Sequence, residues 1–127
     1  MSALILDAGA LIAVDRDDPS MIARLRVVHS AGLELRTTGV VVAEVWRDPT
    51  GRQSNLARLL KSVDVRAVDD RLGRTAGVLL GRARRGHAAD ATIVAIAAAG
   101  DRIVTGDPGD ISGLVAASGR QIAVVAC

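Results

Sequence analysis

The sequence predicts an α/β fold in which helices cover both faces of a mainly parallel central sheet. Short apolar runs, typical of buried strands, alternate along the chain with stretches of helical periodicity. The expected order is β-α-α-β-α-α-β-α-α-β-α-β, and strands that alternate with helices form parallel sheets. Because 127 residues is the length of one domain, we expect a single domain over residues 1–127.

In the first third of the chain, residues 3–6 form an apolar run like that of a buried strand. Residues 8–14 can turn helical. A second helix is expected from Asp18-Pro19 to about residue 29, because proline is tolerated in the first helical turn. Residues 33–37 then alternate as a strand does.

The middle of the chain contains one segment whose local signal is a strand. Residues 40–46 are rich in valine, and β-propensity alone favours a strand there. Residues 54–63 carry leucines and valine at helical spacing, and residues 63–68 resemble a strand. Asp69 is a good N-cap for a helix over residues 72–85.

The last third continues the alternation. Residues 89–99 are rich in alanine and predict a helix that ends before a glycine, and residues 102–105 predict a strand. Residues 107–109 (DPG) predict a turn, residues 111–118 a short helix and residues 121–126 a last strand.

Composition excludes several classes of protein. Half of the residues are hydrophobic, but Trp46 is the only aromatic residue, so the core must consist of Ala, Val, Leu and Ile. The only cysteine, Cys127, excludes a disulfide framework and a thiolate zinc site. We find no signal peptide and no apolar run long enough to span a bilayer, and we therefore expect a cytoplasmic protein without a membrane partner.

Four carboxylates are expected at one edge of the sheet. Asp7 directly follows the first strand and Asp107 closely follows the fourth, and the carboxyl ends of parallel strands meet at one edge. Asp90 lies in the first turn of a helix that could face the same crevice. Glu44 is the only charge among residues 40–46, and its burial would cost several kcal/mol unless a cation compensated it.

Such a cluster points to metal-dependent phosphoryl chemistry. Neighbouring carboxylates repel one another and their pKa values rise unless cations share the site. Mg²⁺ and Mn²⁺ prefer oxygen ligands, and such ions can activate a water and stabilise the leaving oxygen in phosphodiester cleavage. Neither histidine nor cysteine is placed to offer zinc a site.

Each acid also has a purely structural interpretation. Asp7 and Asp107 could cap the segments that follow them, and Asp110 could cap the last helix, since aspartate is favoured at that position. Asp90 could be a first-turn residue favoured by the helix dipole, and Glu44 could be solvated on an exposed strand. These interpretations stay open for each residue alone, whereas the combination favours a site.

Four segments together resemble one known family. They are residues 4–13 (LILDAGALIA), 42–45 (VAEV), 89–95 (ADATIVA) and 103–111 (IVTGDPGDI). In order, spacing and total length they are similar to PIN-domain ribonucleases, specifically to the VapC-type toxins of bacterial toxin–antitoxin pairs. The resemblance covers the whole chain.

The resemblance implies a three-layer α/β/α sandwich and places a helix over residues 40–46, against their propensity. It implies a Mg²⁺- or Mn²⁺-dependent endoribonuclease that acts as a toxin, with a small cognate antitoxin and a homodimer as partners. The acids that would hold the metal and carry catalysis are Asp7, Glu44, Asp90 and Asp107. Asp110 matches an outer acid, and Thr105 matches a hydroxyl that hydrogen-bonds the acids or a metal-bound water.

This chain departs from the family at two positions. Gly9 stands where many relatives carry serine, and Gly106 replaces a commoner serine or other polar residue. A hydroxyl that would support the metal ligands is therefore missing.

The charge is divided along the chain in a way that suggests an RNA surface. Residues 52–86 carry a net charge of +6, whereas residues 1–51 and 87–127 carry −2 each. Arginine offers a bidentate fork to phosphate, and the arginines expected to bind the RNA backbone are Arg47, Arg82, Arg84 and Arg85. The alternative is a solvated helix face.

The remaining candidates, Trp46, His29 and His87, are expected to have structural rather than functional roles. Trp46 is expected in the core or at a subunit interface rather than stacked on a base, and His29 and His87 on the surface or as caps.

Two other functions stay open. A non-catalytic PIN module that binds RNA or protein is kept open by Gly9 and Gly106. A phosphoacceptor receiver-like domain would need a lysine near the acids, but the only lysine, Lys61, lies in a helical stripe.

Overall fold

A computed structural model of the chain describes residues 2–47 and 51–127. The strands are β1 (Ala3–Leu6), β2 (Glu34–Thr38), β3 (Val63–Arg66), β4 (Arg102–Thr105) and β5 (Ala123–Ala126). The helices are α1 (Ala8–Asp15), α2 (Pro19–Ser30), α3 (Gly39–Val45), α4 (Ser54–Leu60), α5 (Asp70–Ala83), α6 (Ala88–Ile96) and α7 (Pro108–Ser118). The predicted order of strands and helices is confirmed.

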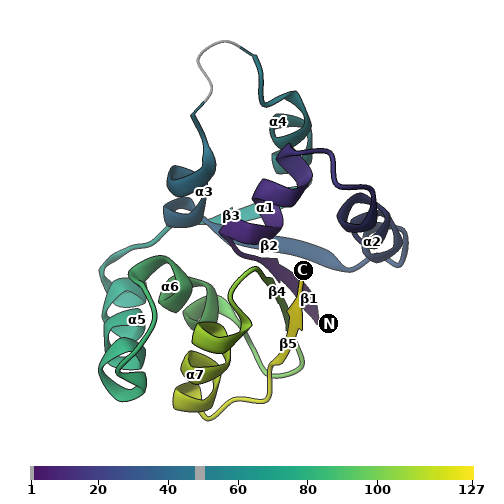
Figure 1. Ribbon diagram of the computed structural model, residues 1–127. Helices are drawn as coiled ribbons and strands as arrows, with labels where there is room; N and C mark the ends of the chain where they lie inside the picture. Colours follow the sequence, from purple (N-terminus) through teal and green to yellow (C-terminus); the bar gives the residue numbers. More distant parts are fainter. Residues whose placement is uncertain (1, 48–50) are drawn as a thin grey trace.

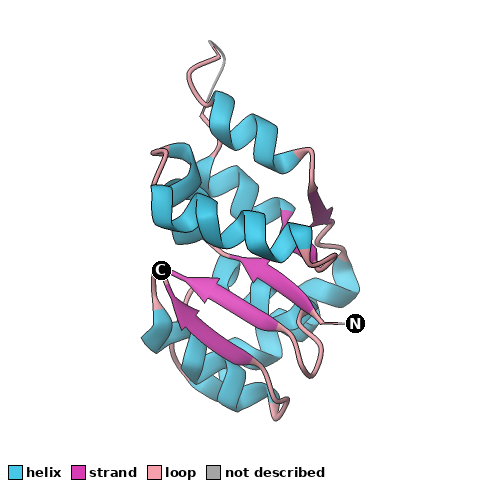
Figure 2. Cartoon of the chain, turned by 90° about the vertical axis from the view of Figure 1, so that its right-hand side faces the viewer, coloured by secondary structure: helices cyan, strands magenta, loops and turns pink. Residues whose placement is uncertain are grey.

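All strand pairs are parallel, and the sheet order is β3-β2-β1-β4-β5. Helices α1 to α4 lie on one face and α5 to α7 on the other (Figure 1), and Figure 2 shows the strands between these two layers. The predicted α/β/α sandwich is confirmed, with a sheet that is wholly rather than mainly parallel.

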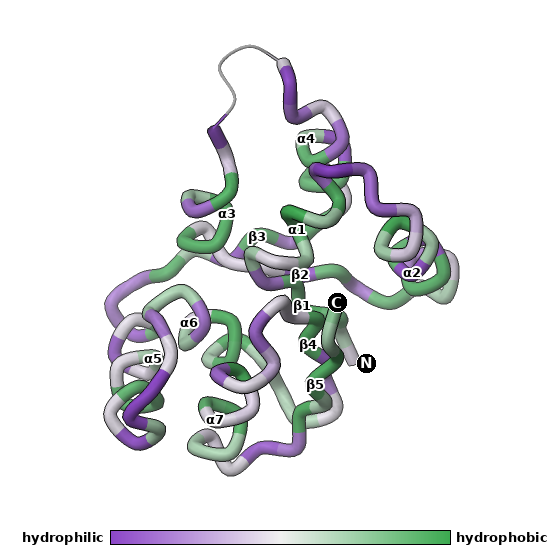
Figure 3. Tube along the Cα trace, viewed as in Figure 1, coloured by the Kyte–Doolittle hydropathy of each residue, from purple (hydrophilic) through white to green (hydrophobic). Residues whose placement is uncertain are grey.

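The core is centred on β1 and β4, two of the three strands with neighbours on both sides. Ile5, Leu6, Ile103 and Val104 have no exposed surface. Figure 3 shows these strands as hydrophobic segments, while the outer turns of α5 are mostly hydrophilic. Among the described residues the buried hydrophobic side chains are aliphatic apart from Met21, so the core expected from composition is confirmed.

Residues 40–46 do not form the strand that their propensity favours. They lie in α3, as the resemblance implied. The Thr38 side chain accepts a hydrogen bond from the backbone N–H of Val41 at 3.3 Å and so caps the helix. Val41 and Val45 are buried in the core, and this packing outweighs a weak local preference.

Several boundaries differ from the predictions. The turn predicted at residues 107–109 is wrong, because Asp107 caps α7 and Pro108 begins it. The last strand begins at Ala123 rather than at residue 121, and α4 ends at Leu60 rather than at residue 63. Proline in the first turn has no N–H to lose, so a helix start was the better interpretation.

The strand order reverses between β1 and β4, since β2 and β3 extend the sheet on one side and β5 on the other. Ligands of parallel α/β sheets bind beyond the carboxyl ends of the strands at such a switch point. No helix in the described part of the chain is both long enough and apolar enough to span a membrane.

Candidate metal centre

Three aspartates meet at the carboxyl edge of the sheet, beside the switch point. Asp90 lies in the first turn of α6, while Asp107 caps α7 and Asp110 lies in its first turn. One carboxylate oxygen from each lies within 4.8 Å of the other two. We refer to Asp90, Asp107 and Asp110 as the acid cluster. The sequence placed Asp110 outside the metal-binding acids, whereas the structure includes it in the cluster.

Asp7 lies next to this cluster but is bound to the backbone. Its side chain is 4% exposed. It accepts hydrogen bonds from the N–H of Ala10 at 3.0 Å and from the N–H of Gly106 at 3.2 Å. The capping role considered for Asp7 is therefore real, and the second bond ties the end of β1 to the loop after β4.

The Asp7–Gly106 bond depends on a close approach of two glycines. A Cβ added to Gly9 would lie 2.8 Å from the Cα and N atoms of Gly106, which real Cβ atoms essentially never do. A serine at position 9 would therefore push the loop away from α1. The glycine at position 9 is required by backbone packing, and sequence reasoning noted only the missing hydroxyl.

The Thr105 hydroxyl supports the backbone of the site. It is fully buried and accepts a hydrogen bond from the N–H of Asp107 at 2.8 Å. Asp107 in turn accepts from the N–H of Asp110 at 3.3 Å and so caps α7. The interpretation of Asp110 as the cap of this helix is wrong, because Asp107 is the cap. Thr105 thus acts on the backbone of an acid rather than on its carboxylate.

The pKa of Asp90 is raised above its ordinary value. Partial burial is the largest cause, and the negative charges of Asp7 and Asp107 add to it. The backbone N–H of His87, 3.4 Å from Asp90, donates to the carboxylate and opposes the shift. A cation at this position would relieve the repulsion among these carboxylates.

Glu44 lies outside the acid cluster. It is exposed on α3, so the expectation that a lone carboxylate is buried among apolar residues is wrong. The helical turn separates Glu44 from Val41 and Val45, which face the core. Its role as a ligand stays a prediction.

Three buried threonines that the sequence did not indicate as site residues form hydrogen bonds near the carboxyl ends of β1 and β2 and at α6. The hydroxyl of Thr92 donates to the carbonyl of Ala89 at 2.7 Å and lies 3.0 Å from the hydroxyl of Thr38. Thr37 donates to the carbonyl of Leu6 at 2.7 Å, directly before Asp7. The feature that marks these threonines is that polar side chains are buried, and burial becomes visible only in the folded structure.

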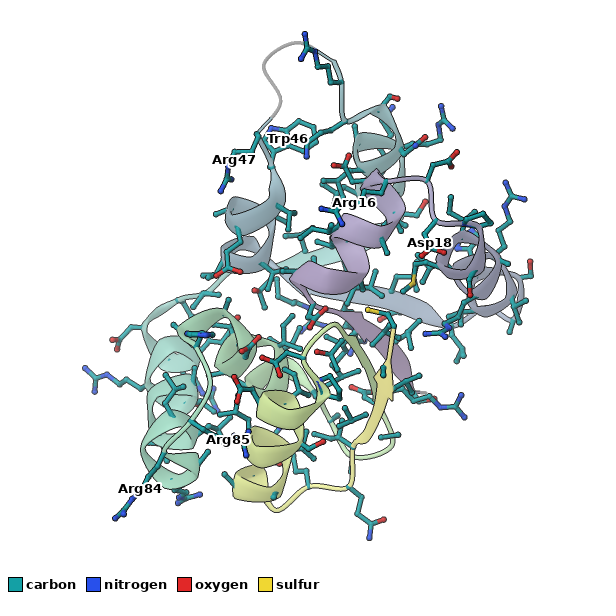
Figure 4. All side chains as sticks on the ribbon, in the orientation of Figure 1. Arg16, Asp18, Trp46, Arg47, Arg84 and Arg85 are labelled. Carbon is teal, nitrogen blue, oxygen red and sulfur yellow. The ribbon has the colours of Figure 1, made fainter. Side chains whose placement is uncertain are left out.

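The predicted RNA-binding arginines divide into two groups. All four are exposed, but among the described residues Arg47, Arg82 and Arg84 make no ion pair with the acid cluster, and Figure 4 shows Arg84 pointing away from the end of α5. Arg85 instead lies between α5 and α7 (Figure 4), where its Nε donates to Asp110 at 3.1 Å. Arg85 therefore belongs to the acid cluster rather than to a free basic surface.

The two histidines lie where their structural interpretations put them, and the core position considered for Trp46 is wrong. His29 and His87 are exposed, and His87 is the residue before α6, at its cap position. Trp46 ends α3 and is 38% exposed, so it is not part of the core.

The chemistry of these donors fits a hard divalent cation. In the described residues the candidate metal-binding group consists of carboxylates alone, with no histidine or cysteine, and Mg²⁺ and Mn²⁺ prefer such oxygens. The Cys127 backbone N–H donates to Thr105, and the pKa of its thiol is raised by partial burial and by Asp7. A protonated thiol is a poor metal ligand.

A separate hollow of about 410 Å³ lies between α2, α4 and β2. Leu25, Leu35 and Leu59 are among its lining residues, together with Arg26 and Arg58. None of the predicted site residues lines it, so it does not compete with the sheet edge as the site of phosphoryl chemistry.

Neither a protein-family model nor a curated protein matches the sequence. The solved structures that are similar in fold include two complexes with DNA. VapBC2 from Rickettsia felis, bound to a DNA fragment from its promoter, has a TM-score of 0.74 and 12% identity, and the match covers 98% of both chains. FitAB bound to an IR36 DNA fragment has a TM-score of 0.63 and 17% identity, and the match covers 97% of this chain and 94% of the other. At these identities the likeness is one of fold, and the chain has the PIN-like α/β/α sandwich that the sequence resemblance implied.

Proposed function

We propose that the chain is a Mg²⁺- or Mn²⁺-dependent endoribonuclease that acts in the cytoplasm as the toxin of a toxin–antitoxin pair. The observation that carries this proposal is the acid cluster, whose oxygens lie within 4.8 Å of one another at the switch point of a PIN-like sheet. An isolated group of acids is common on protein surfaces, but this group lies where ligands of parallel sheets bind.

The residues of the site would have different roles in the reaction. Asp90 and Asp107 would hold the cation, and Asp7 would keep the end of β1 and the loop after β4 together through its two backbone bonds. A bound divalent cation supplies activation of water and stabilisation of the leaving oxygen. The exposed Arg47, Arg82 and Arg84 would bind RNA phosphates, since arginine pairs with phosphate bidentately.

The antitoxin and the homodimer remain proposals that rest on the resemblance. The similar chains come from VapBC2 and FitAB, both solved with DNA, which supports a search for a small DNA-binding partner encoded beside this chain. Light scattering on the purified chain, alone and with that partner, tests both proposals, and a monodisperse monomer in each case would contradict them.

The receiver-like alternative loses support. Lys61 follows α4 and precedes β3, so it lies at the amino edge of the sheet, opposite the acids. A phosphoacceptor site needs its lysine beside the acids.

The decisive test compares Asp90→Asn with Asp70→Asn. Asp70 is exposed and forms an ion pair with Arg74 on the surface, so it is a matched control. With transfer RNA and ribosomal RNA as probes, we expect wild type and Asp70→Asn to cleave in the presence of Mg²⁺ and Asp90→Asn to lose at least about 100-fold of the rate. Sequencing of the RNA ends would identify the cleavage site. Undiminished Mg²⁺-dependent cleavage by Asp90→Asn would refute the proposed site, and absence of cleavage by wild type would favour a non-catalytic module.

A further inference from the structure

We infer that Arg85 is a fixed counter-cation of the acid cluster. Its guanidinium occupies the Asp110 side of the cluster, so that the cluster binds one divalent ion rather than two. The inference rests on the proposed function and concerns the number of metal ions at the same site. It assigns Arg85 a role different from that of Arg47, Arg82 and Arg84.

The backbone directs Arg85 toward the cluster. Helix α5 ends at Ala83, and Arg84 adopts a left-handed conformation with φ of 55°. Gly86 follows with φ of 91°. A residue other than glycine is uncommon in the left-handed conformation. This turn directs Arg85 from the end of α5 toward α7, where its Nε lies 3.1 Å from the Oδ1 of Asp110.

The arginine lies in a furrow that glycine makes possible. A Cβ added to Gly113 on α7 would lie 2.7 Å from the Cδ of Arg85 and 3.3 Å from its Cγ. A Cβ on Gly109, one turn earlier, would lie 3.5 Å from its Nη2, an ordinary contact. Any residue other than glycine at position 113 would therefore displace the Arg85 side chain. The furrow fixes the guanidinium beside the cluster although the side chain is 54% exposed.

Charge balance explains what a fixed cation does there. The three carboxylates of the acid cluster carry three negative charges, which Arg85 and one divalent cation balance. A second divalent cation would have to share Asp110 with the guanidinium and would be repelled by it. Without Arg85, Asp110 offers both carboxylate oxygens and the cluster has the charge to attract a second ion.

The test is calorimetric titration of the metal-free full-length chain with MnCl₂ and without RNA. We expect wild type to bind one Mn²⁺. Arg85→Gln is expected to bind a second Mn²⁺ and to bind the first about tenfold more tightly, because a positive charge beside the site is removed. Arg85→Lys, which keeps the charge, is expected to bind one.

Matched variants separate the position of the arginine from its charge. Gly113→Ala keeps every charge but displaces Arg85, and alanine is the better helix former, so it should fold and titrate like Arg85→Gln. Gly109→Ala makes the same substitution on the same helix without a clash and should titrate like wild type. Arg71→Gln removes the same charge about 20 Å away along α5 and should also titrate like wild type.

The outcomes distinguish this inference from the proposed function. If wild type binds two Mn²⁺, or if Arg85→Gln and Gly113→Ala titrate like wild type with one, the inference is overturned and the metal centre stands. If no variant binds Mn²⁺, the proposed function fails and the inference fails with it.

Discussion

Two buried aspartates lie at opposite edges of the sheet, and only their surroundings distinguish them. Asp7 at the carboxyl edge is 4% exposed and accepts from the N–H groups of Ala10 and Gly106. Asp101 at the amino edge is 2% exposed and accepts from the N–H groups of Ala3 and Ala98, both at 2.8 Å. Both carboxylates hold the backbone of the central strands together.

The two edges differ in whether further carboxylates lie near the buried aspartate. Asp7 is close enough to Asp90 to raise its pKa, and Asp90 belongs to the acid cluster. In the described part of the chain, Asp101 belongs to no group of potential metal ligands. Burial and backbone hydrogen bonds therefore identify a structurally important aspartate, and further carboxylates within a few ångströms identify a site.

The largest expected effect separates the two edges by metal affinity. Asp107→Asn removes a charged oxygen ligand from the acid cluster and should weaken Mn²⁺ binding by at least about 100-fold. Asp101→Asn should leave the affinity of the folded protein unchanged, because its bonds lie at the other edge. Calorimetric titration with MnCl₂ measures both, and a loss of affinity in Asp101→Asn would break the comparison.

The second effect concerns stability without metal. Asp101→Ala leaves the buried N–H of Ala3 and the partly buried N–H of Ala98 without their partner and should lower the free energy of unfolding by about 2–4 kcal/mol. Asp7→Ala leaves two such groups as well but also removes a charge that repels Asp90, so its loss should be smaller. Urea unfolding in EDTA tests this order, and an Asp7→Ala loss larger than that of Asp101→Ala would contradict it.

The third effect is a pH dependence at the carboxyl edge alone. Because the pKa of Asp90 is raised in the folded chain, its contribution to stability is present below the unfolded pKa and is lost as the pH rises through the folded pKa. Metal-free Asp90→Asn should therefore be more stable than wild type at pH 7, and the difference should shrink on acidification.

Thermal unfolding in EDTA from pH 3 to pH 7, about the range of carboxyl titration, measures this difference. Asp70→Asn is the control. A constant difference between Asp90→Asn and wild type across that range would show that repulsion in the cluster is not its cause.

The smallest effect is expected at Glu44. Its carboxylate is exposed, and an exposed charge acts on a metal through water of high dielectric constant. Glu44→Gln should change stability by less than about 0.5 kcal/mol and weaken Mn²⁺ binding by no more than about tenfold. A loss as large as that of Asp107→Asn would make Glu44 a direct ligand.

The sequence was a good guide to the elements and to the edge at which the acids gather. Alternation of strands and helices placed Asp7 and Asp107 at one edge, and this requires only that the strands be parallel. Local propensity by itself was wrong for residues 40–46, where β-branched residues pack in the helix that the resemblance implied. The expected burial of Glu44 was wrong as well, because its side chain is exposed on this helix. Propensity is a weak local preference that core packing overrides.

Periodicity and composition were enough to predict the parallel α/β architecture, the aliphatic core and the carboxylates at the strand ends. Three contacts could be found only in the folded chain: Asp110 with Asp90 and Asp107, Gly9 with Gly106, and Arg85 with Asp110 in the furrow at Gly113. Each of these contacts depends on the approach of two elements to within a few ångströms. Such distances are set by the packing of the layers and leave no trace in local spacing.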